Sequence, residues 1–140
     1  MELKILDNIN DDIVKIRREA FVYGRSVPEE IEFDGKDSSL KHFCLYDNDV
    51  LIAYLRSEDM GDFIHIGRVA VKKDRRAKGL GRVLFTYLFD YAKEKGFTFI
   101  ELSAVKTAQG FYEKMGFSPF GEYYLETGTE HIYMKKTIIL

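Results

Sequence analysis

Residues 75–81 read RRAKGLG, a short stretch that holds three cations and two glycines. The residues before it, FIHIGRVAV at 63–71, are rich in β-branched and aromatic side chains and predict a strand. The residues after it, at 80–95, predict an amphipathic helix, because apolar side chains recur there at helical spacing. The stretch is therefore expected to form the turn between a strand and a helix. The apolar positions of that helix are Val83, Leu84, Tyr87, Leu88, Tyr91 and Ala92.

A cationic, glycine-containing turn before a helix is typical of an anion site. The first N–H groups of a helix have no partner within the helix, and the helix dipole adds partial positive charge. Two known phosphate loops do not fit the pattern. Lys78 precedes the glycine, and no Ser or Thr stands where a nucleoside-triphosphate loop would hold magnesium. A dinucleotide fingerprint needs three glycines, and only Gly79 and Gly81 are present.

The remaining pattern, Arg76-x-x-Gly79-x-Gly81, resembles the acetyl-CoA motif (Arg/Gln)-x-x-Gly-x-(Gly/Ala) of the GNAT superfamily of N-acetyltransferases. Val-Ala-Val at 69–71 and FYEKMGF at 111–117 extend the resemblance, and the order of predicted elements agrees with it over most of the chain. Glycines suit such a loop because a Cβ would hold the backbone away from the phosphates.

The resemblance implies roles for individual residues. Val69, Ala70 and Val71 match the strand whose backbone bonds the pantetheine arm as an added strand would. Phe111 and Tyr112 match a Phe-Tyr pair in which the tyrosine commonly acts as general acid toward the CoA thiolate. A phenol with a pKa of about 10 is a suitable donor for that step. The residues that match the pyrophosphate loop are Arg76, Ala77, Lys78, Gly79, Leu80, Gly81 and Arg82.

The N- and C-terminal regions are similar to the ElaA-like branch of the superfamily. The similar residues are GEYYLETGTEHIYM at 121–134, FVYGRSVPEE at 21–30, and His42. Two departures affect what the branch implies. Val105 stands where many superfamily members have Asn and the branch often has Gln, and Gly24-Arg25 stands where the branch usually has Glu-Gln. We expect residues 24–41 and the tail hairpin to shape the acceptor pocket, so the second departure prevents inference of the acceptor.

Transfer of an acetyl group to an amine requires a group that removes a proton, because alkylamines are mostly protonated at pH 7. His65 occupies the place on its strand where several superfamily members keep a glutamate base. Its alternative interpretation is a side chain on a strand face without a catalytic role. His131 and Glu126, in the tail, are the other candidates for the base, and their alternative is a solvated hairpin. The alternative interpretation of Tyr112 is that it is only a core aromatic, since it lies on the apolar face of its helix.

The rest of the chain completes the predicted fold. Strands are expected at 3–6, at 42–57 as a hairpin around Asp47-Asn48-Asp49, at 97–104, and on both sides of Thr127-Gly128; helices are expected after Asn10 or Asp11 and within 107–117. Gly96 and Gly116 are expected to cap helices in the left-handed conformation. The order predicts a mixed α/β fold, GNAT-like, with a mostly antiparallel sheet of six to seven strands flanked by three to four helices. We expect a single domain over residues 1–140.

Composition narrows the function classes. With a net charge of −2 the basic turn is a local feature, so we expect no general affinity for nucleic acid. The single cysteine, Cys44, is expected to be a buried small hydrophobe in a protein of the reducing cytoplasm. No signal peptide, long apolar span or metal-site spacing is visible, so we expect neither membrane nor metal. The acidic cluster at 29–37 is expected to be a solvated loop or an attractor for a cationic acceptor.

The sequence therefore predicts an acetyl-CoA-dependent N-acyltransferase with acetyl-CoA as acyl donor. Its acceptor would be a primary amine of a small molecule or peptide, and its state a monomer or homodimer. The alternative is a non-catalytic acyl-CoA-binding or regulatory module on the same fold, which would keep Gly79 and Gly81 but lack a working base.

Overall fold

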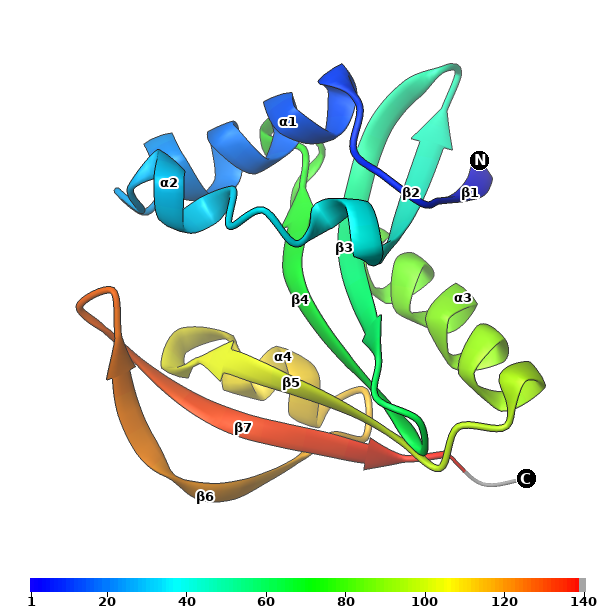
Figure 1. Cartoon of the computed structure of the whole chain (residues 1–140), viewed down its shortest axis with the longest axis vertical. Helices are drawn as coiled ribbons and strands as arrows, with labels where there is room; N and C mark the ends of the chain where they lie inside the picture. Colours follow the sequence, from blue (N-terminus) through cyan, green and yellow to red (C-terminus); the bar gives the residue numbers. More distant parts are fainter. Residues whose placement is uncertain (139–140) are drawn as a thin grey trace. The chain divides into compact units, whose positions relative to one another are not determined.

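The computed structural model describes residues 1–138, which form two compact units (Figure 1). The first unit holds residues 1–58 and 68–88. The second holds residues 59–67 and the chain from Phe89 onward. Strand β4 (Phe63–Val71) and helix α3 (Leu80–Lys95) each contribute to both units. The expectation of one domain over residues 1–140 stays a prediction.

The fold class is confirmed as mixed α/β with a mostly antiparallel sheet of seven strands. The strand order is β1-β2-β3-β4-β5-β7-β6, and β4 pairs with β5 in parallel, as the helix between them requires. The other strands of the sheet are β1 (Glu2–Leu6), β2 (Lys41–Asp47), β3 (Val50–Asp59), β5 (Phe99–Val105), β6 (Ser118–Glu126) and β7 (Thr129–Thr137). The other α-helices of residues 1–138 are α1 (Asp11–Arg17), α2 (Glu29–Glu32) and α4 (Gln109–Glu113).

The hairpin turn and the helix caps lie where the local sequence predicts them. Asn48 and Asp49 both have positive φ, +48° and +64°, which matches a two-residue hairpin turn between β2 and β3. The side chain of Asn10 accepts a hydrogen bond from the Ile13 N–H at 2.9 Å, so Asn10, and not Asp11, is the cap of α1. Gly96 and Gly116 have φ of +81° and +95°, which confirms their left-handed conformation.

Other boundaries differ from the expectations. The helix expected within 107–117 is a 3-10 turn (Lys106–Ala108) followed by α4, and the strand expected at 97–104 begins at Phe99. Helix α1 continues as a π-helix (Arg18–Tyr23). Tyr87, one of the apolar positions that the sequence predicts for α3, is 38% exposed. Phe85, which is not among those positions, is buried. These differences arise because apolar spacing locates a helix but leaves its ends and the rotation of its face free within one residue.

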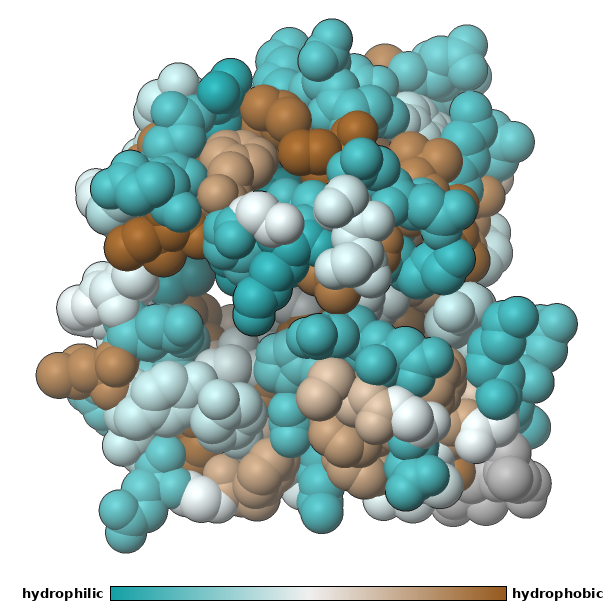
Figure 2. Space-filling view, viewed as in Figure 1, coloured by the Kyte–Doolittle hydropathy of each residue, from teal (hydrophilic) through white to brown (hydrophobic). Residues whose placement is uncertain are grey.

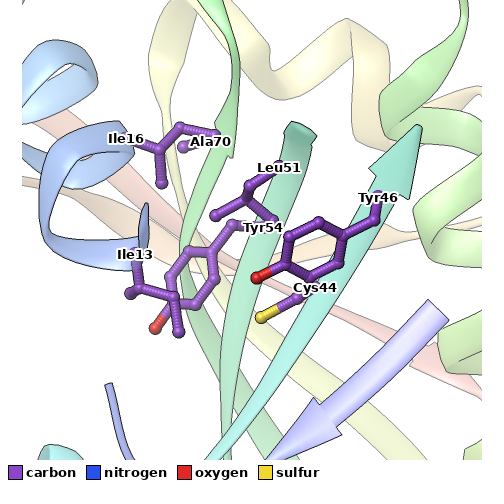
Figure 3. Packing of buried hydrophobic residues seen from close by; sticks show 7 residues of the cluster. All are labelled: Ile13, Ile16, Cys44, Tyr46, Leu51, Tyr54 and Ala70. Carbon is purple, nitrogen blue, oxygen red and sulfur yellow. The ribbon is translucent and has the colours of Figure 1, made fainter. Parts of the chain in front are cut away.

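The core of the first unit joins α1 to its strands (Figure 3). Ile13 and Ile16 of α1 pack against side chains of β2, β3 and the C-terminal end of β4; the strand residues are Cys44, Tyr46, Leu51, Tyr54 and Ala70. Burial raises the pKa of the Cys44 thiol to about 12, so the sulfur stays protonated and behaves as a small hydrophobe. The prediction that Cys44 is a buried small hydrophobe is confirmed.

The core of the second unit lies on one face of β4, β5 and β7. Strand β5 shows the pattern clearly, because Ile100, Leu102 and Ala104 are buried while the alternate residues Glu101 and Ser103 are half-buried on the opposite face. Figure 1 shows β5 alongside β7, with β6 forming a hairpin with β7. Over the face of the molecule drawn in Figure 2, hydrophilic and hydrophobic residues are interspersed.

Candidate active site

The loop between β4 and α3 is exposed and has an unusual backbone. Arg76, Ala77, Lys78 and Gly79 are all exposed, and the chain enters α3 at Leu80. Ala77 and Gly79 have φ of +62° and +75°, in the left-handed region. A Cβ built on Gly79 would meet no atom within 4 Å, so the space beside this backbone is open. The loop is therefore an open cradle at the N-terminus of a 16-residue helix, where N–H groups and the helix dipole favour an anion.

Contacts within the first unit fix the base of this loop. The Lys73 N–H donates to Glu19 Oε1 at 2.9 Å, and Arg75 Nη1 lies 3.1 Å from Asp47 Oδ2. Arg76 Nε donates to the Val71 carbonyl at 3.1 Å. The loop is thus tied to its own strand and to the neighbouring turn, while Lys78 stays exposed. An anchored base with exposed cations suits a phosphate group.

The backbone of strand β4 departs from the extended conformation at Arg68. Its parallel ladder with β5 runs from Phe63 opposite Phe99 to Ile66 opposite Leu102. Arg68 then has a φ of +56°, which breaks the extended backbone. Val69, Ala70 and Val71 follow in the first unit, with Ala70 buried and the two valines half-buried. That these three residues bind a cofactor stays a prediction.

His65 has a carboxylate partner. It lies opposite Glu101 in the parallel ladder, and its Nδ1 is 2.7 Å from Glu101 Oε1. Because an ionised carboxylate only accepts hydrogen bonds, Nδ1 carries a proton, and the lone pair of the neutral ring is on Nε2. The side chain is one-third exposed. The pairing orients the imidazole and leaves Nε2 free of the Glu101 contact. That His65 acts as the base stays a prediction.

His131 lies in a different environment. It is 7% exposed, its Nδ1 donates to the Thr129 carbonyl at 2.8 Å, and its Nε2 is 3.8 Å from Glu126 Oε2. Its ring stacks on Tyr124. The solvated-hairpin alternative is therefore wrong for His131, although Glu126 is exposed as that alternative expects.

Tyr124 and Ser103 belong to the same region, and sequence reasoning missed both. The two hydroxyl groups are hydrogen-bonded to each other across the second unit. Burial raises the pKa of Tyr124 to about 12, so its hydroxyl stays protonated at neutral pH. The ring of Tyr124 also stacks on Tyr133 of β7. The face that carries His65 and Glu101 thus continues into a row of half-exposed aromatic side chains.

Tyr112 and Phe111 lie on α4 in the second unit. Tyr112 is 8% exposed and contacts Phe111 and Phe117 edge-to-face, with ring centroids 5.2 and 5.9 Å away. Phe111 is 39% exposed. Tyr112 is thus a buried aromatic, as its alternative interpretation expects, and burial does not conflict with a catalytic hydroxyl. That Tyr112 acts on the same ligand as the cationic loop stays a prediction.

The acidic cluster at 29–37 is solvated only in part, because Glu29, Glu30 and Asp34 are exposed. Glu32 and Asp37 are buried, and both pair with Arg17, which is 0% exposed. Arg17 Nε lies 2.8 Å from Glu32 Oε2, and its Nη1 lies 2.8 Å from Asp37 Oδ1. Arg56 Nη2 lies 2.7 Å from Asp34 Oδ2, and the hydrogen bond from Arg56 holds the pKa of Asp34 well below its usual range. Glu32, Asp34 and Asp37 are thus paired with arginines, so these three carboxylates are poor attractors for a cationic acceptor.

His42 belongs to this network and is structural. Its Nε2 lies 2.8 Å from the Asp37 carbonyl oxygen, so Nε2–H donates there and Nδ1 accepts from the Tyr54 hydroxyl at 2.6 Å. Burial lowers the pKa of His42, which keeps the ring neutral. Both nitrogens are used, so His42 is not a candidate base.

The chain belongs to the acetyltransferase (GNAT) family, whose model matches residues 10–117. Among curated relatives, protein YyaT of Bacillus subtilis is 31% identical over 130 residues, which cover 91% of this chain and 88% of YyaT. Protein ElaA of Escherichia coli is 30% identical over 135 residues, which cover 91% of this chain and 86% of ElaA. The resemblance to the ElaA-like branch is therefore confirmed.

Solved structures agree with the fold. An acyl-CoA N-acyltransferase from Pseudomonas aeruginosa has a TM-score of 0.84 at 28% identity, covering 96% of this chain and 98% of that one. Escherichia coli ElaA has a TM-score of 0.85 at 26% identity, covering 97% of this chain and 99% of that one. Within residues 1–138, no helix has the length and apolar character needed to cross a membrane. In the same residues, no group of three or more His, Cys, Asp or Glu side chains is placed to hold a metal ion.

Proposed function

We propose that the chain transfers an acetyl group from acetyl-CoA to a primary amine of a small molecule or peptide by direct attack. Membership of the acetyltransferase family supports acyl transfer. The observation that carries the choice of donor is the open cationic cradle at 76–82, which suits a pyrophosphate. Acetyl-CoA supplies a thioester, which is reactive toward amines and releases a thiolate.

Different groups of the chain would bind the pyrophosphate, the pantetheine arm and the acetyl carbonyl. The first-turn N–H groups of α3 and the exposed side chains of Arg76 and Lys78 would hold the pyrophosphate. The backbone of Val69–Val71 would bond the pantetheine arm in the manner of an added strand. One N–H of that backbone would polarise the acetyl carbonyl and stabilise the negative charge that forms on its oxygen.

Two groups of the second unit would move protons, and a third would orient one of them. His65 accepts a proton from the attacking amine at Nε2, and Glu101 holds the imidazole in the tautomer that this step needs. Tyr112 donates its phenolic proton to the departing sulfur. The amine nitrogen forms a bond to the acetyl carbon as the carbon–sulfur bond breaks, so the products are an amide and free CoA.

His65 is preferred to His131 as the base. His65 is one-third exposed and has a carboxyl partner that orients it, whereas His131 is 7% exposed. An amine that is part of a small molecule or peptide must reach the base from solvent, and the exposure of His65 allows this approach. The monomer or homodimer state and the cytoplasmic location stay predictions.

A matched pair of variants at Gly79 tests the cradle. Asn and Asp have nearly the same shape, and both tolerate a left-handed backbone better than other non-glycine residues do. Either side chain would fill the open space beside the backbone, but only Asp adds negative charge. In calorimetric titrations we expect wild type to bind acetyl-CoA, and Gly79→Asp to bind it at least ~10-fold more weakly than Gly79→Asn, a cost of about 1.4 kcal/mol.

The difference between the two variants should shrink as salt is added, since the loop is exposed. Thermal unfolding of each variant checks that it is folded. Equal affinities of folded Gly79→Asp and Gly79→Asn would mean that the loop does not hold an anion.

A further inference from the structure

Arg68 has a conformation and a set of contacts that the proposed reaction does not use. A left-handed backbone is uncommon for a residue other than glycine, and Arg68 adopts it inside a strand, directly before Val69. Such a conformation persists only where the surroundings hold it in place, and it often marks a functional position. The side-chain partners of Arg68, which are Ile31, Glu32 and Asp34, are in the first unit with it.

The guanidinium of Arg68 binds one short segment at four points. Its Nη2 donates to the carbonyls of Ile31 and Glu32 at 3.2 and 3.1 Å. Its Nε lies 3.1 Å from Glu32 Oε2, and Nη2 lies 3.5 Å from Asp34 Oδ2. The side chain of Arg68 is 25% exposed, and that of Glu32 is 3% exposed. Arg68 thus fastens the end of α2 to strand β4.

Charge, more than apolar burial, holds this segment. Ile31 is 48% exposed, and Phe33 is half-buried beneath the guanidinium of Arg17 at 4.7 Å. Glu32 and Asp34 instead pair with arginines, which come from α1, β3 and β4; they are Arg17, Arg56 and Arg68. Arg68 is the member of this set that is adjacent in sequence to Val69.

We propose that Arg68 is a positioning residue that couples the segment 29–34 to the backbone of Val69–Val71. Release of the segment would free the guanidinium, and the left-handed backbone at Arg68 would lose the contacts that maintain it. Conversely, a ligand that holds the backbone of Val69–Val71 in place would favour the state in which Arg68 binds the segment 29–34. The inference rests on the proposed function, since it joins the strand proposed for acetyl-CoA to a segment expected to shape the acceptor pocket. Acceptor and donor binding would then be linked.

Two substitutions separate the guanidinium from the backbone conformation. Arg68→Gly removes the side chain but accepts positive φ without strain, and Arg68→Lys keeps the charge but loses the planar fork. Arg18→Gln is the matched control, because Arg18 forms an exposed ion pair with Glu29 of the same segment. Hydrogen–deuterium exchange of the peptide covering 29–37 is measured with and without acetyl-CoA, and the affinity for acetyl-CoA is measured by calorimetry.

Without ligand, we expect the segment to exchange at least ~10-fold faster in Arg68→Gly than in wild type, with Arg68→Lys between them and Arg18→Gln unchanged. Acetyl-CoA should slow exchange of the segment in wild type and Arg18→Gln. In Arg68→Gly it should bind with little effect on the segment. Loss of coupling with retained binding is a result that a merely structural arginine would not give.

The proposal is overturned if ligand-free Arg68→Gly exchanges at the wild-type rate, or if acetyl-CoA slows the segment equally in both proteins. Wild type that binds no acetyl-CoA would refute the proposed function and, with it, the coupling. In that case faster exchange in ligand-free Arg68→Gly would still establish that Arg68 fastens the segment, so the two failures are distinguishable.

Discussion

Tyr112→Phe is expected to lower turnover with an accepted amine by about 10²- to 10⁴-fold, the usual contribution of a general acid. The dissociation constant for acetyl-CoA should hardly change. The substitution removes only the hydroxyl, and the ring that contacts Phe111 and Phe117 remains. Without a proton donor, the sulfur must leave as a free thiolate. Steady-state turnover and calorimetric titration of the same preparations separate the loss of rate from a loss of binding.

Tyr91→Phe makes the same chemical change elsewhere. Tyr91 lies on α3, where its ring packs against Phe97, and has no part in the proposed reaction. It should retain full turnover. If folded Tyr112→Phe also turns over at the wild-type rate, Tyr112 is only a core aromatic.

Arg17→Met is expected to lower the free energy of unfolding by about 3–5 kcal/mol, the usual cost of breaking a buried ion pair from one side. Arg17 is 0% exposed and pairs with Glu32 and Asp37. Met fills much of the volume but cannot hydrogen-bond, so two carboxylates lose their main buried partner. Chemical denaturation of wild type and variant measures the difference.

Two further proteins isolate the charge effect. Arg18→Gln removes an exposed ion pair one residue away and should change stability by less than about 1 kcal/mol. Adding Glu32→Gln and Asp37→Asn to Arg17→Met removes the two carboxylate charges that lost Arg17. It should restore only part of the loss, because Arg68 and Arg56 then lose these partners as well. A loss in Arg17→Met no larger than that in Arg18→Gln would contradict a stabilising role for the network.

The cradle could be predicted from sequence because its signals are local. Two glycines and three cations lie within seven residues, between a run of β-branched residues and an amphipathic helix. The hairpin turn at Asn48-Asp49 and the cap at Asn10 follow for the same reason. Such features depend on a few neighbouring residues, and tertiary contacts rarely override them.

The buried ion network could not be predicted in this way. Its members come from four separate segments: Arg17 from α1, Arg56 from β3, Arg68 from β4, and the acids from 32–37. A run of acidic residues usually lies in solvent, because charged side chains are rarely buried. Only the tertiary fold brings compensating arginines to Glu32 and Asp37, so the sequence pattern did not predict that these two are buried.

The candidate base could be named from the sequence, but its hydrogen-bond partner could not. His65 is visible in the strand, but its partner Glu101 is 36 residues away and reaches it through the register of the parallel ladder. A shift of one residue in that register would turn Glu101 to the opposite face. The hydrogen bond between Ser103 and Tyr124 depends on pairing in the same way. Sequence reasoning names single residues at such sites, while strand pairing supplies their partners.

Release of free thiol from acetyl-CoA in the presence of pooled primary amines tests acetyl transfer most directly, with mass spectrometry to identify any acetylated amine. We expect amine-dependent thiol release by wild type, one acetyl amide formed for each thiol, and little release by Gly79→Asp. Binding of acetyl-CoA without thiol release from any pool would contradict the proposed reaction. That result would leave the chain as a non-catalytic acyl-CoA-binding module.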